Sequence, residues 1–108
     1  MKIFLDTAVY EDIEKANQSG LIDGVTTNPS LILKSGGDPV ETIKKIAGEF
    51  PFFESISAEV VADNALDMVE QAYAFKDMEN VTIKVPLTVE GLKACKLLTT
   101  DGLSLIHI

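Results

Sequence analysis

The feature that most constrains the fold is a regular alternation of short strand patterns and helix patterns along the chain. Strand patterns cover residues 2–6, 21–27, 52–60, 80–86 and 103–108. Helix patterns begin near Thr7 or Ala8, and after the capping residues Asn28, Asp38, Asp63 and Thr88. No hairpin signal joins consecutive strands. This alternation predicts a parallel sheet with right-handed crossover connections.

The side chains of the strands distinguish an open sheet from a closed barrel. Central strands of an open, doubly wound sheet are buried on both faces and form continuous apolar runs. Here the first four strands carry apolar residues on one face only. The other face holds Phe4, Asp6, Thr26, Ser55, Ser57, Glu59, Thr82 and Lys84. We therefore expect an α/β fold of the (β/α)8 TIM-barrel type, with about five strands and four βα units present and catalytic groups at the carboxyl ends of the strands.

Lys84 lies in the middle of an otherwise apolar strand, where it shares one face with Thr82. A buried ammonium group is costly and tends to lose its proton. The resulting neutral amine is a nucleophile, and its commonest covalent chemistry is a Schiff base with a carbonyl group. A lysine that extends from a strand edge into water explains the same pattern. From these residues alone, both interpretations stand.

Composition excludes several classes of function. The 108 residues are 46% hydrophobic and 24% charged, which suits one globular unit. A net charge of -8 argues against binding to nucleic acid or to anionic membranes. No apolar run approaches the roughly 18 residues of a membrane span, and no signal peptide is recognisable, so we expect a cytoplasmic enzyme. The single cysteine, Cys95, and the single histidine, His107, form no metal-ligand cluster. Cys95 is interpreted as a small buried helix residue.

Several segments resemble the transaldolase family, and more narrowly its short-chain branch, which includes the fructose 6-phosphate aldolases. The matching segments are Leu5-Asp6-Thr7, Gly24 to Ile32, Ala58-Glu59-Val60, Ile83 to Pro86, Thr88 and Glu90-Gly91-Leu92. The resemblance extends from residue 1 to about residue 102. The runs Thr-Thr-Asn-Pro-Ser and Lys-Val-Pro, in this order and spacing, are its most specific motifs.

The resemblance implies roles for three catalytic residues. Lys84 corresponds to the lysine that holds a dihydroxyacetone unit as a Schiff base, so that neither a metal nor an organic cofactor is needed. Asp6 corresponds to the acid-base residue that exchanges a proton with the substrate hydroxyl. Glu59 corresponds to the glutamate that moves protons through a water molecule during carbinolamine dehydration. The alternatives are a helix cap for Asp6 and a solvated strand-end carboxylate for Glu59.

The resemblance also implies how the substrate is bound and what the reaction is. Asn28 matches a residue that hydrogen-bonds substrate hydroxyls, and Thr26 lines the pocket; Asn28 also suits the cap before Pro29. The implied function is transfer of a dihydroxyacetone unit between sugar phosphates in the pentose phosphate pathway, by a homo-oligomer when full length. The alternative is reversible cleavage of fructose 6-phosphate to dihydroxyacetone and glyceraldehyde 3-phosphate. Those aldolases tend to carry glutamine at the position of Glu59, so this residue favours transaldolase.

The sequence departs from the family in two ways. Short-chain members are about twice as long, with phosphate-binding serine and arginine residues in their second half. Residues 103–108 replace an Asn-Val-Thr segment, and we interpret them as a divergent, truncated tail in which His107 has no role; a natural half-barrel is the alternative. We therefore expect little or no turnover from residues 1–108, and a non-catalytic fragment is the second class of function that remains.

Overall fold

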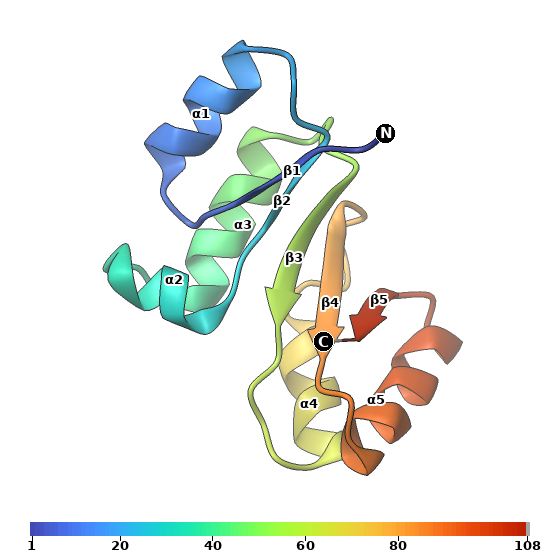
Figure 1. The fold of residues 1–108 in the computed structure, drawn as a ribbon. Coiled ribbons are helices and arrows are strands. Elements are labelled where there is room, and N and C mark those ends of the chain that lie inside the picture. The colour runs from blue at the N-terminus through green and yellow to red at the C-terminus, as the bar shows by residue number, and fades with distance from the viewer. Residues whose placement is uncertain (108) are drawn as a thin grey trace.

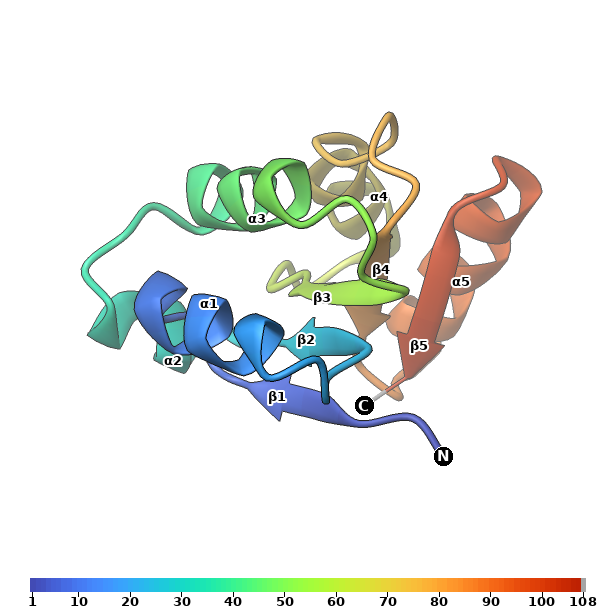
Figure 2. The same cartoon turned by 90° about the horizontal axis from the view of Figure 1, so that it is seen from above.

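Five strands form one parallel sheet in the order β1-β2-β3-β4-β5 in the computed structural model, which describes residues 1–107 (Figure 1). The strands are β1 (Phe4–Asp6), β2 (Gly24–Thr26), β3 (Ser55–Glu59), β4 (Val81–Val85) and β5 (Ser104–His107). The helices are α1 (Tyr10–Gln18), α2 (Pro29–Lys34), α3 (Pro39–Glu49), α4 (Ala65–Tyr73) and α5 (Val89–Thr100). Seen from above, the strands follow a curve from β1 to β5 (Figure 2). The predicted parallel α/β arrangement is confirmed.

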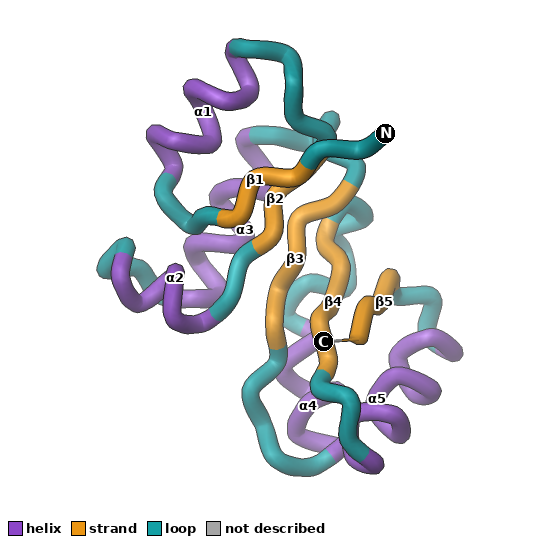
Figure 3. Tube along the Cα trace, viewed as in Figure 1, coloured by secondary structure: helices purple, strands orange, loops and turns teal. Residues whose placement is uncertain are grey.

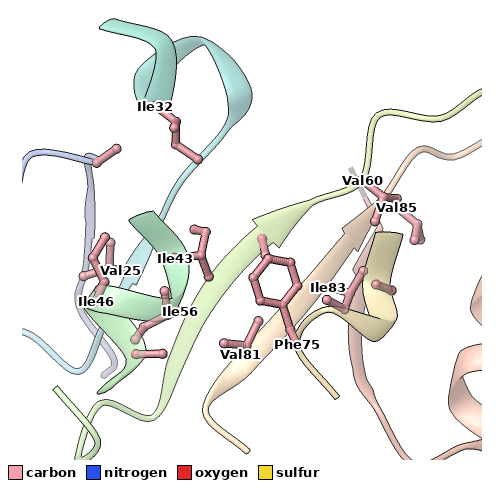
Figure 4. Close-up of a cluster of buried hydrophobic side chains, with 14 of the residues drawn as sticks. Val25, Ile32, Ile43, Ile46, Ile56, Val60, Phe75, Val81, Ile83 and Val85 are labelled. Carbon is pink, nitrogen blue, oxygen red and sulfur yellow. The ribbon is translucent and has the colours of Figure 1, made fainter. Parts of the chain in front are cut away.

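Alternation along the strands decides which face of the sheet is buried. Val81, Ile83 and Val85 are at most 5% exposed, whereas Thr82 and Lys84 between them are half-buried. The core extends into neighbouring strands and the helices that cover them (Figure 4). Its largest fully buried side chains are Ile13, Val25, Ile43, Ile46, Ile56, Met68, Ile83, Val85 and Leu98. Burying one such side chain contributes about 1.5–3 kcal/mol, so this face holds the sheet and helices together.

Three helices begin at the capping residues predicted from the sequence. The side-chain oxygens of Asn28, Asp38 and Thr88 each accept a hydrogen bond, at 3.0 Å, from the backbone N–H three residues later. Pro29 and Pro39 follow two of these caps, where a missing N–H costs nothing. The start of each helix is therefore fixed by local chemistry.

Two predicted helix starts are wrong. The first helix begins at Tyr10 and not at Thr7 or Ala8, because the Thr7 hydroxyl accepts from the Val9 N–H and forms a local turn instead. The cap of α4 is Asn64 and not Asp63. Asn64 both accepts from the backbone N–H of Asp67 and donates to its carboxylate, which secures the first turn on both sides.

The buried face of α4 is not the one formed by Leu66, Val69 and Tyr73, which lie at helical spacing in the sequence. The structure buries Ala65, Met68 and Ala72 instead, and leaves Leu66 75% exposed. The reason is tertiary. The backbone N–H of Ala65 donates to Glu90 of α5 at 3.3 Å, so the first turn of α4 lies against α5 and turns Leu66 outward. On α3 the apolar residues at helical spacing do face the core: Ile43, Ile46 and Ala47 are buried, and Val40 is partly buried against them.

Other differences are small. The first four strands are shorter than predicted, because residues 21–23 and 51–54 form turns and connections before β2 and β3. Cys95 is half-buried in α5 and packs against the core. Residue 108, the end of the last predicted strand, lies outside the described residues. Within residues 1–107, no helix is both long enough and apolar enough to cross a bilayer.

Candidate active site

Polar side chains from four consecutive strands gather on the sheet face opposite the apolar core. Asp6, Thr26 and Glu59 are the last residues of β1, β2 and β3, and Lys84 is the last but one of β4. The parallel register pairs Asp6 with Thr26, and Glu59 with Lys84. Strands β1 to β4 lie beside one another (Figure 3) and pair in parallel, so these residues meet at one edge of the sheet.

Lys84 has two acceptors, one on the adjacent strand β3 and one in the residue that follows β2. Its Nζ lies 3.7 Å from Glu59 Oε2 and donates a hydrogen bond to the main-chain oxygen of Thr27 at 3.3 Å. The two side chains of the ion pair are 21% and 23% exposed, so Lys84 neither extends into open water nor is fully enclosed. A carboxylate beside the amine can accept its proton, which is the requirement for turning an ammonium into a nucleophile.

Asp6 and Thr26 form the second pair of the site. The Thr26 hydroxyl donates to Asp6 Oδ1 at 2.9 Å, across the two paired strand ends. Asp6 is exposed on this face. The alternative of a helix cap is wrong for Asp6, because α1 has Val9 at its N-cap and no side-chain cap. The carboxylate is therefore available to a ligand on the polar face.

Asn28 follows the carboxyl end of β2 and is half-buried. Its Oδ1 accepts from the Leu31 N–H at 3.0 Å and caps α2, so the structural part of the expected double role is confirmed. The cap uses the side-chain oxygen only. The amide nitrogen can still donate to a hydroxyl group of a ligand.

Two residues of this region were missed by sequence reasoning. Thr27 and Ser57 are 0% and 4% exposed, and three hydrogen bonds join them. The available signal was weak: Ser57 was placed on the polar face of its strand, and Thr27 is the second of two adjacent threonines. Pattern alone did not indicate that the main-chain oxygen of Thr27 would contact Lys84.

The arrangement places an amine on β4 and two carboxylates on β3 and β1 at one edge of the same sheet. Lys84 forms an ion pair with Glu59, and Asp6 lies two strands beyond Glu59, hydrogen-bonded to Thr26. An amine of this kind can form a Schiff base with a carbonyl compound, and the carboxylates can move the protons that such a reaction requires.

Comparison with known proteins gives one consistent answer. Residues 3–106 match the family described as Transaldolase/Fructose-6-phosphate aldolase. A probable transaldolase of Sinorhizobium medicae (strain WSM419) is 53% identical over 105 residues, which cover 94% of this chain and 46% of that protein. A probable transaldolase of Paracoccus denitrificans (strain Pd 1222) is 50% identical with the same coverage. One of Mesorhizobium japonicum is 49% identical over 109 residues, covering 100% of this chain and 49% of that protein.

The parallel sheet with helices between its strands defines an α/β protein, and its sequential strand order is consistent with part of a barrel. The chain belongs to the Transaldolase/Fructose-6-phosphate aldolase family, so its five strands are part of a (β/α)8 barrel, as predicted. It spans about half the length of the curated relatives that it matches. A divergent tail after residue 102 stays a prediction; the family match reaches residue 106, and residues 104–107 form β5.

Proposed function

We propose that this chain carries the Schiff-base site of a transaldolase, which transfers a dihydroxyacetone unit between sugar phosphates. The observation that supports it most is the position of Lys84, whose Nζ lies between Glu59 and the Thr27 carbonyl at the open strand ends. The substrates are small phosphorylated sugars of the pentose phosphate pathway, in the cytoplasm. In a full-length protein we expect a homo-oligomer and phosphate contacts from the second half of the barrel.

The first stage is formation of the Schiff base. Glu59 accepts a proton from Lys84, and the neutral amine adds to the ketose carbonyl to give a carbinolamine. Glu59 then supplies a proton through a water molecule, water leaves, and an iminium forms. The 3.7 Å between Nζ and Oε2 leaves Glu59 close enough for this exchange once a water molecule lies beside it. The iminium is itself the electron sink, so the proposal needs neither metal nor organic cofactor.

The second stage breaks and remakes a carbon-carbon bond. Asp6 takes the proton of the substrate hydroxyl, the electron pair of the breaking bond moves into the iminium to give an enamine, and an aldose leaves. An acceptor aldose then reacts with the enamine, and Asp6 returns the proton. Hydrolysis releases the new ketose from Lys84. The hydrogen bond from Thr26 orients the Asp6 carboxylate, and the amide of Asn28 binds substrate hydroxyls.

The alternative activity is cleavage of fructose 6-phosphate without an acceptor. The family description names both activities. An enzyme that releases dihydroxyacetone unaided continues without an acceptor, whereas a transaldolase stops after one aldehyde per Lys84. Glu59, where the aldolases tend to have glutamine, favours transfer.

Acceptor dependence tests the proposal. The chain is incubated with fructose 6-phosphate, and released glyceraldehyde 3-phosphate is measured before and after an aldose phosphate is added, with Lys84→Met as control. We expect at most one equivalent per chain at first, and only slow further release after the acceptor is added, because these residues span about half of their relatives and little turnover is expected of them. Continuous release without an acceptor would identify an aldolase. If no aldehyde is released and no covalent adduct forms, the proposal is wrong for this chain.

A further inference from the structure

We infer that Ser57 and Thr27 are positioning residues that set where the amine of Lys84 stands, an inference that rests on the proposed function of Lys84. Three hydrogen bonds join the two residues. The backbone N–H of Thr27 donates to Ser57 Oγ at 2.8 Å, the Thr27 hydroxyl donates to the Ser57 carbonyl at 2.7 Å, and Ser57 Oγ donates to the Thr27 carbonyl at 3.3 Å. We call this arrangement the Thr27–Ser57 latch.

The latch joins β2 and β3 beyond the point where the backbone pairing between these two strands ends. Strands β2 and β3 are paired at only two positions, Gly24 with Ser55 and Val25 with Ile56. Beyond these pairs, the backbone of Thr27 reaches β3 through the side chain of Ser57. The direction of the Thr27 carbonyl therefore depends on its hydrogen bonds to Ser57, two through the serine hydroxyl and one from the Thr27 hydroxyl to the Ser57 carbonyl.

That carbonyl is a direct partner of Lys84, whose Nζ donates to it at 3.3 Å. Thr26, one residue earlier, holds Asp6 on the other side of the site. Thr27 is fully buried and Ser57 nearly so, and a buried hydrogen-bonding group without its partner is strongly disfavoured, which makes the latch a rigid support. The adjacent residues Thr26 and Thr27 therefore contact both Asp6 and the amine of Lys84.

Reaction rates are sensitive to such positioning. A displacement of about 1 Å in a reacting group can lower the rate about 100-fold. Ser57→Ala removes the oxygen that fixes Thr27, so we expect Lys84 to form a Schiff base about tenfold or more slowly. The effect should appear in the rate at saturating substrate and not in KM, because neither latch residue is a proposed substrate contact.

The same strand provides a matched control. Ser55 lies two residues before Ser57 on the same polar face, and its hydroxyl pairs with that of Thr82 at 2.6 Å. Ser55→Ala removes one hydrogen-bonded hydroxyl from β3 without touching Thr27 or Lys84. A second pair of variants acts on the other partner of the latch: Thr27→Val loses the hydroxyl, and Thr27→Ser keeps it.

The first readout does not depend on sugar chemistry. In protein labelled with 15N-lysine and 13C-carbonyl, we expect a scalar coupling between the Lys84 ammonium nitrogen and the Thr27 carbonyl carbon. Ser57→Ala and Thr27→Val should lose this coupling, whereas Ser55→Ala and Thr27→Ser should retain it. Circular dichroism checks folding, and if Ser57→Ala does not fold, the two Thr27 variants decide.

The second readout is the rate of borohydride-trapped adduct on Lys84 at saturating dihydroxyacetone. We expect the latch-breaking variants to be about tenfold or more slower, with Ser55→Ala and Thr27→Ser near the unmodified chain. Equal behaviour of Ser57→Ala and Ser55→Ala in both readouts overturns the inference. A coupling that responds to the latch, in a chain that traps nothing at Lys84, instead supports the positioning and overturns the proposed function.

Discussion

The two sides of the polar face are built differently. On the side of the proposed nucleophile Lys84, called the nucleophile side below, β3 and β4 are paired over four residues, and Lys84 and Glu59 are only 21% and 23% exposed. On the acid-base side, β1 and β2 are paired over three residues, and Asp6 is exposed together with Phe4. The apolar core beneath β4 is almost completely buried. The difference teaches that the fold of this chain encloses the proposed nucleophile, Lys84, more than the proposed acid-base residue, Asp6, which lies on a more open strand.

Replacing each carboxylate by its amide should give the largest effects on activity. The two replacements should affect different steps of the reaction. Asp6→Asn should lower carbon-carbon cleavage about 10²- to 10⁴-fold, because general acid-base catalysis contributes that much, yet leave adduct formation with dihydroxyacetone nearly unchanged. Glu59→Gln should slow adduct formation itself. Both are measured by borohydride trapping with dihydroxyacetone and by aldehyde release from fructose 6-phosphate. Loss of trapping in Asp6→Asn would show that Asp6 is also needed for adduct formation, and would contradict the separate roles of the two sides.

Substitutions in the core should lower the free energy of unfolding more on the nucleophile side than on the acid-base side. Ile83 of β4 is 1% exposed, whereas Leu5 of β1 is only partly buried against the core. We expect Ile83→Ala to lower the free energy of unfolding by about 2–5 kcal/mol, and Leu5→Ala by less. Urea denaturation followed by circular dichroism measures both. Equal losses would show that β1 is as well supported as β4.

The hydrogen bond between Thr26 and Asp6 should have a smaller effect, confined to the acid-base side. Thr26→Val removes the hydroxyl that donates to Asp6 Oδ1 at 2.9 Å. A hydrogen bond to a charged group contributes about 1.5–3 kcal/mol, and exposure places this one at the low end, so we expect about a tenfold loss of cleavage. Thr26→Ser, which retains the hydroxyl, is the control and should cleave normally. An equal loss in both variants would exclude the hydrogen bond as the cause.

The smallest expected effect is on how stability depends on pH, and it concerns α4 and α5 on the nucleophile side. The hydrogen bond from Lys93, followed by that from the Ala65 N–H, lowers the pKa of Glu90 below its ordinary value. A carboxylate with a lowered pKa in the folded state stabilises the fold above the unfolded-state pKa of about 4.3, and this contribution is lost as the pH falls through the folded-state pKa. Urea midpoints at pH 7 and pH 3 should differ less in Glu90→Gln than in the unmodified chain. An unchanged difference would contradict the assignment.

The sequence was most informative where local chemistry decides the structure. A period of two along the strands predicts that Lys84 and Glu59 lie on the face opposite the core, and the cap residues Asn28, Asp38 and Thr88 predict helix starts that the structure confirms. These features depend on backbone geometry and near neighbours alone.

Tertiary contacts account for what the sequence did not predict. The buried face of α4 depends on how its first turn meets Glu90 of α5, a residue 25 positions away. The Thr27–Ser57 latch depends on the position at which the ladder between β2 and β3 ends. Neither can be read from periodicity, because each arises from the relative position of two elements.

Covalent trapping at Lys84 tests the central claim most directly. The chain is incubated with dihydroxyacetone and borohydride, and the adduct is located by intact mass and peptide mapping. Lys84→Met and Lys93→Met serve as variants, since Lys93 also pairs with a glutamate, at 3.0 Å, but its side chain is 63% exposed. We predict one adduct per chain on the peptide with Lys84, lost in Lys84→Met and retained in Lys93→Met. An adduct spread over exposed lysines, or none at Lys84, would contradict its role as the nucleophile.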